Sequence, residues 1–456
     1  MTYPNDPKDL IRSLDRDQQD IAARDAERLE LEEGVAEEGL AGVVLEESGP
    51  EVGPDAGPDA VDRSAIRGRR QSALPKQADP DAPLLVVEDL RTYFSLESGT
   101  VKAVDGVSFT LADGEALGIA GESGCGKTTT ALSLVRLLPP NAEIVSGSVR
   151  LFGIDLLKKS ETAIRRYRWR EISVIFQGAM NALNPVQRVA DQIAEPIELR
   201  LGQSHDDARR RAGELLELVG IPRARGRAYP HELSGGMRQR AMIAMALACD
   251  PAVVIGDEPT TALDVMVQAQ ILELLERLRR ELGLSLILIT HDLSVIAETC
   301  DRVLVMYAGR VAEDGSVAEV FRHPRHPYTQ MLLRAFPNIR NDLRELGTIP
   351  GSPPDLRRPP DGCRFHPRCP LAMDVCRTEQ PPESMVGGVR VACHLYTADG
   401  PGEPVLVPAT EVVSAGAVSP AGGDPVSASP ASAGPVLAGA ASAAAAPADA
   451  GGAPAS

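Results

Sequence analysis

The stretch that most constrains the fold of this chain is GESGCGKT, residues 121–128, which fits the pattern G-x-x-x-x-G-K-[ST]. The apolar run EALGIAG leads into it and predicts a short buried strand, and TTTALSLVRLL follows it and predicts a helix. A Gly-rich turn between strand and helix can aim backbone N–H groups at phosphate oxygens, and the helix N-terminus adds positive charge. The alternative is a chance Gly-rich turn, which the flanking strand and helix disfavour. The stretch therefore predicts a phosphate-binding loop.

Two side chains of this loop are candidates for direct chemistry. Lys127 is long enough to reach the β- and γ-phosphates of a nucleotide, and the hydroxyl of Thr128 is a candidate ligand of Mg²⁺. We interpret Cys125 as a tolerated small residue, whose thiol, if exposed, would make the loop sensitive to alkylation. The nucleotide-binding residues predicted here are Gly121, Glu122, Ser123, Gly124, Cys125, Gly126, Lys127, Thr128 and Thr129.

A pair of carboxylates completes the predicted site. In VVIGDEPT, Asp257 ends an apolar strand, where its carboxylate can hold magnesium through water. Glu258 follows directly and can orient and deprotonate an attacking water. A helix-capping or solvated carboxylate is the alternative for Glu258, and its place beside Asp257 at a strand end disfavours it. The two motifs together predict a nucleoside-triphosphate hydrolase.

The pattern around these motifs is that of an α/β protein, and 456 residues leave room for two or three domains. LLVVEDLRTYF and VKAVDGVSFTL predict strands joined by a short connection, which favours antiparallel pairing. AVVIGD and LSLILIT are continuous apolar runs, typical of parallel strands covered on both faces. DVMVQAQILELLERLRRELG predicts a helix that ends at Gly283, and residues 178–235 predict an inserted helical subdomain.

Charge is concentrated at the two ends of the chain. Residues 1–82 carry 20 acidic and 10 basic side chains, and residues 397–456 carry five acidic and no basic ones. The net charge of −17 therefore leaves −17 + 10 + 5 = −2 for residues 83–396, so a basic nucleic-acid surface is not expected. Residues 1–82 predict an acidic disordered extension, and residues 398–456 predict a disordered Ala/Pro/Gly/Ser tail.

Apolar runs such as LSLILI are far shorter than the ~20 residues needed to span a bilayer. The first 20 residues have no apolar core of the kind found in a signal peptide. We therefore expect a cytosolic chain whose membrane role, if any, comes through a partner. Its seven cysteines are then expected to be reduced thiols or metal ligands instead of disulfides.

Three further stretches turn this pattern into a family resemblance. LSGGMRQR precedes a predicted helix, FQGAMNALNP contains Gln177, and ITHD contains His291 just after an apolar strand. In order with GESGCGKT and GDEPTTALD, they resemble the nucleotide-binding subunits of ABC transporters, over about residues 84–335. The resemblance implies a P-loop ATPase domain with a RecA-like core, an antiparallel β subdomain and a helical subdomain. Gly256, where Ala is common, and QGAM, where QDPM is common, are departures that remove no catalytic group.

The stretch SGG at a helix N-terminus is a second candidate phosphate cradle, formed by Ser234, Gly235 and Gly236. A single chain needs only one phosphate cradle for its own nucleotide. When two chains are set head to tail, the second cradle of each chain can serve the nucleotide bound by the other. The resemblance implies that arrangement, with Ser234 of one chain closing on the γ-phosphate held by the other. It also implies that Asp264, in ALD, touches the opposite subunit.

The resemblance assigns roles to three more side chains. Gln177 would sense the γ-phosphate and magnesium and link them to the membrane subunit. His291 would contact the γ-phosphate and help hold the catalytic geometry; a core histidine at a strand end is the alternative. Tyr93 would stack on adenine, and the choice of ATP over GTP comes from the family.

Beyond the minimal ATPase, HPRHPYTQMLLRAFP and GTIPGSPPDLRRPPDGCRFHPRCP resemble the oligopeptide/dipeptide/nickel branch of ABC importers. FQGAMNALNPV resembles the D-type ATPase of dipeptide transport. The implied partners are a second ATPase subunit, two transmembrane permeases and an extracytoplasmic substrate-binding protein, with this chain held at the cytoplasmic face of the membrane. Import of nickel or another small solute is the alternative, and a non-transport ABC ATPase of DNA repair or translation is a further one. Residues 83–335 are then the ATPase domain, and residues 336–397 a small cysteine-rich domain.

Four cysteines near the C-terminal end follow the spacing C-x5-C-x6-C-x16-C: Cys363, Cys369, Cys376 and Cys393. Structural zinc sites usually use tighter pairs, and wide, uneven spacing suits a [4Fe–4S] cluster with one thiolate per iron. Zn²⁺ with His366 or His394 as a substitute ligand is the alternative. Some members of this transporter branch carry such a cluster at matching cysteines. Its expected role is to staple a small domain, with redox or iron sensing as the sharper hypothesis.

Overall fold

The computed structural model describes residues 83–178, 182–261, 263–335, 348–397 and 400. The predicted acidic extension, the predicted C-terminal tail apart from residue 400, and residues 336–347 of the predicted cysteine-rich domain lie outside these ranges. The strands are β1 (Leu85–Leu96), β2 (Gly99–Leu111), β3 (Ala116–Ala120), β4 (Ala142–Leu151), β5 (Ile154–Asp155), β6 (Ile172–Ile175), β7 (Val253–Asp257), β8 (Ser285–Ile289), β9 (Arg302–Tyr307), β10 (Arg310–Ser316), β11 (Glu383–Val386) and β12 (Val389–Ala392). The helices are α3 (Lys127–Leu134), α4 (Glu161–Arg165), α5 (Val189–Leu201), α6 (His205–Leu218), α7 (Gly235–Ala246), α8 (Val265–Leu282), α9 (Leu293–Thr299), α10 (Val317–Arg322), α11 (Pro327–Ala335) and α12 (Val375–Thr378).

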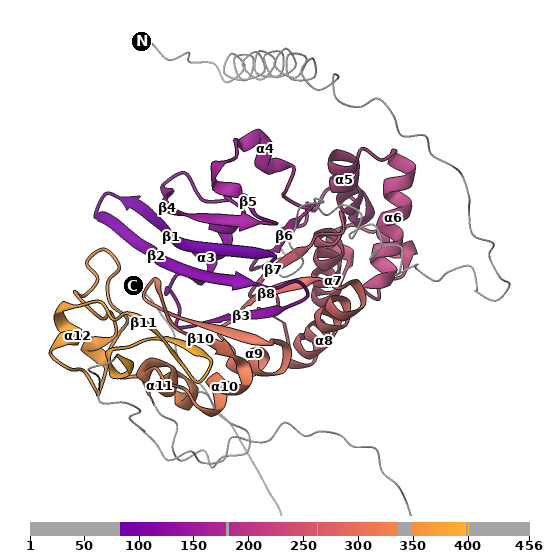
Figure 1. Ribbon diagram of the computed structural model, residues 1–456. Coiled ribbons are helices and arrows are strands. Elements are labelled where there is room, and N and C mark those ends of the chain that lie inside the picture. The colour runs from indigo at the N-terminus through magenta and orange to yellow at the C-terminus, as the bar shows by residue number, and fades with distance from the viewer. Residues whose placement is uncertain (1–82, 179–181, 262, 336–347, 398–399, 401–456) are drawn as a thin grey trace, which may run out of the picture. The chain divides into compact units, whose positions relative to one another are not determined.

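A central mixed sheet has the strand order β11-β12-β10-β9-β3-β8-β7-β6 (Figure 1). Strands β6, β7, β8, β3 and β9 pair in parallel, and β10, β12 and β11 add antiparallel pairs at one edge. Every residue of β3, β7 and β8 is buried, as expected for parallel strands covered on both faces. The sequence-based prediction of these strands is confirmed, and the carboxyl ends of β3 and β7 carry the two predicted motifs.

The second sheet is antiparallel, with the order β2-β1-β4-β5. Its first two strands form the predicted hairpin, in which Leu96 pairs with Gly99. One hydrophobic core joins this sheet to the central one, with Leu85 and Val107 from the hairpin and Ile119 and Ile255 from the parallel strands. Helix α3 contacts β1, β2 and β7, so the helix after the phosphate-binding loop lies between the two sheets.

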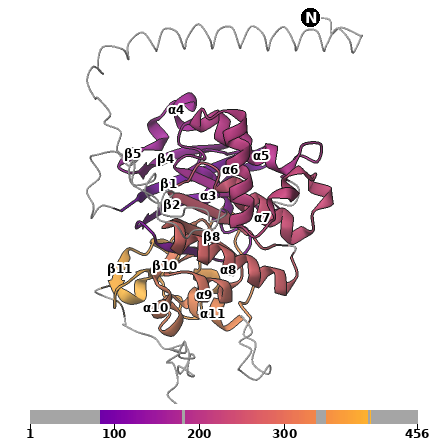
Figure 2. The ribbon, with the colours of Figure 1, turned by 90° about the vertical axis from the view of Figure 1, so that its right-hand side faces the viewer.

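Helices α5 and α6 pack against each other and against α7, and they form most of the segment predicted as a helical subdomain. Both ribbon views show α5 and α6 gathered away from β11, at the other side of the central sheet (Figure 1, Figure 2). Residues 179–181 of the stretch FQGAMNALNP lie outside the described residues. No helix in the described ranges combines the length and the apolar character needed to cross a bilayer.

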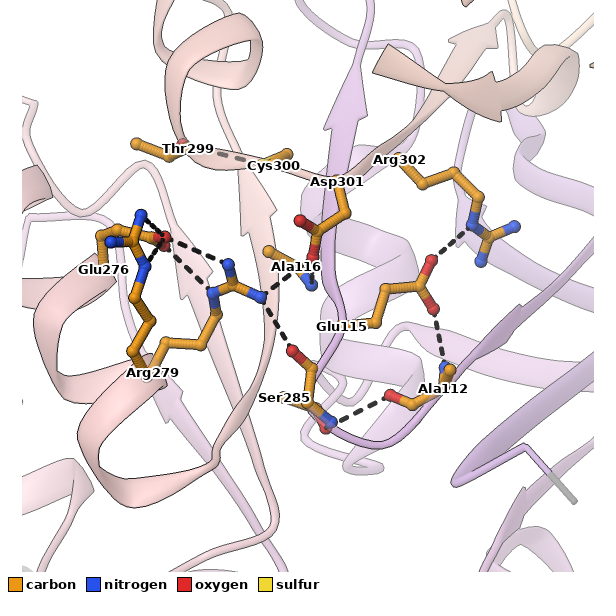
Figure 3. A network of polar contacts seen from close by, with 12 residues as sticks. Ala112, Glu115, Ala116, Glu276, Arg279, Ser285, Thr299, Cys300, Asp301 and Arg302 are labelled. Atoms are coloured by element: carbon orange, nitrogen blue, oxygen red, sulfur yellow. Dashed lines mark hydrogen bonds and ion pairs between the residues drawn. The ribbon is translucent and has the colours of Figure 1, made fainter. Parts of the chain in front are cut away.

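A polar network fixes the beginning of β3, opposite the end that carries the phosphate-binding loop (Figure 3). Arg279 of α8 donates to the carbonyl of Gly114 at 2.8 Å and to Asp301 at 2.9 Å, and it pairs with Glu276. Asp301 in turn accepts the backbone N–H of Ala116, the first residue of β3, at 2.9 Å. On the other side, Glu115 pairs with Arg302 at 2.7 Å. Helix α8 and strand β9 are thereby tied to the same point of β3.

The C-terminal segment adds two short strands to one edge of the central sheet. Strand β12 pairs with β10, with Val391 opposite Glu313. Arg390 on β12 forms an ion pair with Asp314 on β10 at 2.8 Å. This pairing is possible because β10 has an edge that its pairing with β9 leaves open, and an edge strand offers unpaired backbone groups to any strand that reaches it. The four cysteines therefore lie in a segment that is anchored to the ATPase sheet.

The network at β3 gives a stability prediction with a matched control on the same helix. Replacing Arg279 with Met leaves the carboxylate of Glu276 and the carbonyl of Gly114 without their shared guanidinium. We expect a loss of about 1–3 kcal/mol in the free energy of unfolding, measured by denaturant titration. Arg280→Met is the control: Arg280 is 74% exposed and pairs only with Glu276 in the described structure, so a change within about 0.5 kcal/mol is expected. Equal losses for both variants would contradict this account.

Candidate nucleotide-binding site

The phosphate-binding loop connects β3 to α3 and is closely confined by two other strands. Gly121 has φ +147°, and a Cβ there would lie 2.2 Å from the carbonyl oxygen of Met306 on β9. Gly126 has φ +107°, and its Cβ would lie 2.2 Å from the carbonyl oxygen of Ala103 on β2. Real Cβ atoms do not approach backbone oxygens so closely, and an L-residue is strained at these angles. The loop can pass between β2 and β9 only with glycine at both positions.

The ammonium group of Lys127 lies against the loop itself. Its Nζ donates to the carbonyl oxygens of Gly121 at 2.8 Å and Glu122 at 3.2 Å, and only 6% of the residue is exposed. A lysine held this way places a positive charge at the centre of the turn, where phosphate oxygens would replace the carbonyls as partners. The position agrees with the role predicted from the motif.

Two of the predicted magnesium ligands are brought together from the first turn of α3 and the end of β7. The hydroxyl of Thr128 donates to Oδ1 of Asp257 at 3.1 Å. Asp257 ends β7 and is 2% exposed; burial and the neighbouring charge of Glu258 raise the pKa of its carboxyl, against the hydrogen bond from Thr128. A hydroxyl and a buried carboxylate beside the first turn of α3 are oxygen ligands of the kind that Mg²⁺ prefers. The residues present therefore fit the ion.

Glu258 is held by three side chains from different parts of the chain. Its Oε2 accepts from Nε2 of Gln177 at 2.8 Å and from the hydroxyl of Thr261 at 2.9 Å. Its Oε1 lies 3.3 Å from Nδ1 of His291, which follows β8 and is 67% exposed. The backbone of Glu258 is itself in the left-handed region, at φ +48°, which few residues other than glycine adopt.

The structure thus joins Gln177, Glu258 and His291, which sequence reasoning had placed in one site. Thr261 is an addition: sequence reasoning missed it, although its place three residues after Glu258 in DEPTT is the available signal. A carboxylate held by two donors on one oxygen keeps acceptor capacity on the other. Such a group can accept a proton from a water molecule.

Tyr93 lies on β1 with its hydroxyl tied down. It donates to Oδ1 of the buried Asp105 on β2 at 2.7 Å. Burial alone would raise the pKa of Asp105, but the Tyr93 hydroxyl and the guanidinium groups of Arg364, Arg310 and Arg91 outweigh it and lower the pKa. Sequence reasoning singled out Tyr93 but missed Asp105 and its partners. Nothing in the local sequence marks them, because Arg364 is 259 residues from Asp105.

The second predicted phosphate cradle forms the N-terminus of α7. Ser234 caps the helix, accepting the backbone N–H of Met237 at 3.3 Å, and is exposed. A Cβ at Gly236 would lie 2.8 Å from Cγ1 of Val267 on α8, so close packing of the two helices also requires this glycine. Asp264 caps α8 by accepting the N–H of Val267 at 3.0 Å and is likewise exposed. Both caps leave a helix N-terminus open to solvent.

The thiol of Cys125 is buried. Sensitivity to alkylation was expected only for an exposed thiol, so it is not expected in this structure. The residue is 4% exposed, and burial raises the pKa of its thiol despite the nearby charge of Lys127. The physical reason is that the loop turns this side chain inward: a Cβ on Gly121 would lie 2.7 Å from the Cys125 sulfur. A buried thiol with a raised pKa is a poor nucleophile.

The four C-terminal cysteines lie near one another. Cys376 and Cys393 are buried and Cys363 and Cys369 are half-buried. Burial is the main cause that raises the pKa of Cys369 to about 11 and of Cys393 to about 12, and the charges of the other thiols in the group add to it. Across the residues that the structure describes, no three His, Cys, Asp or Glu side chains are arranged so that they could hold a metal ion.

The two candidate substitute zinc ligands are engaged elsewhere through one ring nitrogen each. Nδ1 of His366 lies 2.9 Å from the carbonyl oxygen of Cys363, and Nε2 of His394 lies 2.9 Å from that of Glu379.

Comparisons with known proteins agree with this geometry. The ABC transporter family matches residues 104–261, and the family described as oligopeptide/dipeptide transporter, C-terminal region, matches residues 312–376. The oligopeptide transport ATP-binding protein OppD of Salmonella typhimurium is 49% identical over 316 residues, 69% of this chain and 94% of OppD. A peptide import ATP-binding protein of Brucella abortus is 50% identical over 314 residues, which cover 68% of this chain and 95% of the Brucella protein.

A solved dimer of an ATP-binding cassette, in a post-hydrolysis state with ADP and phosphate, is 26% identical with a TM-score of 0.47. The match covers 51% of this chain and 98% of the cassette.

The confinement of the loop gives a prediction with an internal control. Gly126→Ala adds a Cβ that meets the backbone of Ala103, whereas a Cβ added at Gly124, at φ +77°, would have nothing within 4 Å. We expect Gly124→Ala to cost about 1–2 kcal/mol in the free energy of unfolding, from backbone strain alone, and Gly126→Ala to cost clearly more. Thermal unfolding of both variants without nucleotide measures this, and equal midpoints would contradict the confinement.

Proposed function

This chain belongs to the ABC transporter ATP-binding family and carries the oligopeptide/dipeptide transporter C-terminal region, and we propose that it powers the import of di- or oligopeptides. As a member of that family it is an ATPase subunit. The names of the relatives from Salmonella typhimurium and Brucella abortus support peptides as the cargo over nickel or another small solute. Selectivity would reside in the partner chains, since nothing in the ATPase site distinguishes one cargo from another.

The observation that carries the proposal is the set of contacts around Glu258. Gln177 and Thr261 both donate to Oε2, which fixes the carboxylate and leaves Oε1 able to accept a proton from the attacking water. His291 would contact the γ-phosphate, and its position beside Oε1 and its large exposure support this role. Because Gln177 comes from outside the parallel strands, its bond to Glu258 would report the state of the site to a neighbouring subunit.

The remaining side chains hold the nucleotide. Lys127 would exchange the carbonyls of Gly121 and Glu122 for the β- and γ-phosphates of ATP. Thr128 and Asp257 would hold Mg²⁺, which neutralises phosphate charge when bound. Tyr93 would stack on adenine.

We propose that two ATPase subunits close head to tail over each nucleotide. The exposed caps Ser234 and Asp264 support this, because the N-terminus of α7 offers a phosphate cradle that its own chain does not use. Val265 and Met266, directly after Asp264, are 82% and 72% exposed. Two neighbouring large apolar side chains with so much exposed surface favour an interface that a partner covers. The partner would be a second, different ATPase subunit.

Two permease subunits and an extracytoplasmic substrate-binding protein would complete the importer. The chain would then be a peripheral protein on the cytoplasmic face of the membrane, held there by the permeases. Co-purification with permeases would distinguish this from a non-transport ABC ATPase.

We further propose that the four C-terminal cysteines hold a [4Fe–4S] cluster, with Zn²⁺ as the alternative. Their wide spacing supports a cluster in which each of the four thiolates binds a different iron. Bound there, a cluster would replace two buried and two half-buried thiols with thiolate–iron bonds and so tie the segment together. The chain's own contribution is the anchoring of that segment to β10.

Replacing Glu258 with Gln tests the chemistry. We expect ATP turnover by the assembled transporter to fall by about 10²–10⁴-fold, while MgATP affinity stays within about threefold, because only the proton acceptor is lost. Glu97→Gln, at an exposed position of the β1–β2 hairpin, is the matched control and should turn over ATP normally. Turnover that survives in Glu258→Gln would remove Glu258 from the mechanism.

The cluster is tested by the metal content of the full chain purified without oxygen. We expect iron and acid-labile sulfide in equal amounts with the visible absorbance of an iron–sulfur protein, all lost in Cys369→Ser. Cys249→Ser removes a buried cysteine outside the group and should keep the iron. Zinc without iron would establish the alternative, and a chain with neither metal would contradict both.

A further inference from the structure

Two arginines of the cysteine-containing segment reach the nucleotide site and the phosphate-binding loop. Arg364 directly follows Cys363, and Arg368 directly precedes Cys369. They are 6% and 8% exposed, respectively. Buried guanidinium groups are retained only where carboxylates and carbonyls pair with them, so their partners define what they hold in place.

Arg368 holds the beginning of the phosphate-binding loop. It forms two parallel hydrogen bonds to the carboxylate of Glu122, Nη1 to Oε2 at 2.6 Å and Nη2 to Oε1 at 3.0 Å. Its own position is fixed by the carbonyl of Pro350 at 2.8 Å and by the hydroxyl of Tyr307 at 3.2 Å. The bidentate geometry restrains Glu122 in orientation as well as in distance.

The backbone of the same loop residue is held from the C-terminal side too. The N–H of Glu122 donates to the hydroxyl of Tyr328 on α11 at 2.9 Å, and Tyr328 is fully buried. Phe365, between the two arginines in sequence, packs on the rings of Tyr307 and Tyr328 with centroids 5.1 Å and 5.4 Å away. Arg368 therefore stands on a rigid aromatic cluster, and a movement of this cluster would move Glu122.

Arg364 reaches the other end of the site. It pairs with Asp105 and donates to the carbonyl of Ala308. Asp105 is the acceptor of the Tyr93 hydroxyl, at 2.7 Å. The chain of contacts runs from the segment of the cysteines, through one buried carboxylate, to the aromatic that would stack on adenine.

We propose that Arg364 and Arg368 are positioning residues for the nucleotide, so that the cysteine-containing segment sets the ATP affinity of its own subunit. Arg368 acts on the phosphate end through Glu122, and Arg364 acts on the adenine end through Asp105 and Tyr93. This rests on two parts of the proposed function: MgATP binds at residues 121–128, and Tyr93 stacks on adenine. Since each arginine is the neighbour of a cysteine, whatever holds Cys363 and Cys369 also holds the two arginines.

The effect of Arg368 on the phosphate end and that of Arg364 on the adenine end are distinguished by titrating the full chain with two ligands. These are MgATP and magnesium tripolyphosphate, which lacks the base. Arg368→Met should raise the Kd of both ligands about five- to 20-fold, because it loosens the phosphate end. Arg364→Met should raise the Kd of MgATP by a similar factor and leave that of tripolyphosphate unchanged. In the assembled transporter, both should raise the KM for ATP with little change in kcat, since neither arginine touches the reacting atoms.

Glu122→Gln keeps the shape of the loop and removes only the charge that Arg368 pairs with. It should match Arg368→Met, and the double variant should be no worse than either single one, because both remove the same interaction. Arg368→Lys should have a higher affinity than Arg368→Met, because lysine keeps the positive charge, but a lower one than the unmodified chain, because lysine lacks the planar guanidinium that binds both carboxylate oxygens. Arg357→Met is the matched control: Arg357 lies in the same segment, is 44% exposed and pairs with Asp355 at 2.6 Å, so the Kd of both ligands should be unchanged.

Arg364→Met and Arg368→Met are both expected to fold. Asp105 keeps Arg91 and Arg310 when Arg364 is lost, and the side chain of Glu122 is 23% exposed and can be solvated when Arg368 is lost. Thermal unfolding without nucleotide checks this, and if Arg368→Met does not fold, Glu122→Gln alone decides. A Kd for MgATP equal to that of the unmodified chain in Glu122→Gln and Arg364→Met, or an additive double variant, would overturn the inference. An unmodified chain that binds no MgATP would instead overturn the proposed function, and this inference with it.

Discussion

The arrangement of the nucleotide site depends on a close approach of backbone to backbone. Residues 121–126 pass between the carbonyl of Met306 on β9 and the carbonyl of Ala103 on β2, each of which would lie 2.2 Å from a Cβ on the loop. The loop is therefore confined by the central sheet on one side and by the antiparallel sheet on the other. Any displacement of β2 against β9 changes the loop, so both sheets contribute to the shape of the phosphate site.

The same confinement brings the C-terminal segment into the site. Strand β9 continues through Tyr307 into the turn of Ala308 and Gly309, and Gly309 donates its N–H to the carbonyl of Cys125 in the loop at 2.8 Å. Arg364 and Arg368 bind this turn and the loop beside it. The cysteine-containing segment is thus part of the wall of the ATP site, although in sequence it begins more than two hundred residues later.

Much of the site could be predicted because its motifs are local. The glycines at 121 and 126, Lys127, and the pair Asp257 and Glu258 each carry their meaning within a few residues, and strand ends in a parallel sheet bring them to one edge. What could not be predicted is the set of long-range ion pairs. Arg364 pairs with Asp105, 259 positions away, and Arg368 pairs with Glu122, 246 positions away. The local sequence around an arginine does not indicate which distant carboxylate it will pair with.

Beyond the five strands predicted from the sequence, β4, β5, β6, β9, β10, β11 and β12 were missed, and for β4, β11 and β12 the reason is a related one. Residues 142–151 of β4 alternate burial only in part, and β11 and β12 are four residues each, too short for a periodicity to stand out. β4 pairs with β1, β12 with β10 and β11 with β12, and each pairing is decided by the edge that the neighbouring strand leaves open. Composition shows where the C-terminal segment begins but not what it packs against, so the pairing of β12 with β10 could not be predicted from it.

The central claim is that residues 121–128 bind MgATP and that the cysteine-containing segment forms part of the same site. Hydrogen–deuterium exchange of the full chain, with and without MgATP, tests it most directly. Backbone amides of residues 121–128 and of residues 363–369 should both exchange more slowly with nucleotide bound, because ordering the loop also orders the arginines that hold it. Exchange that is unchanged in residues 121–128, or that slows there while residues 363–369 are unaffected, would contradict the account.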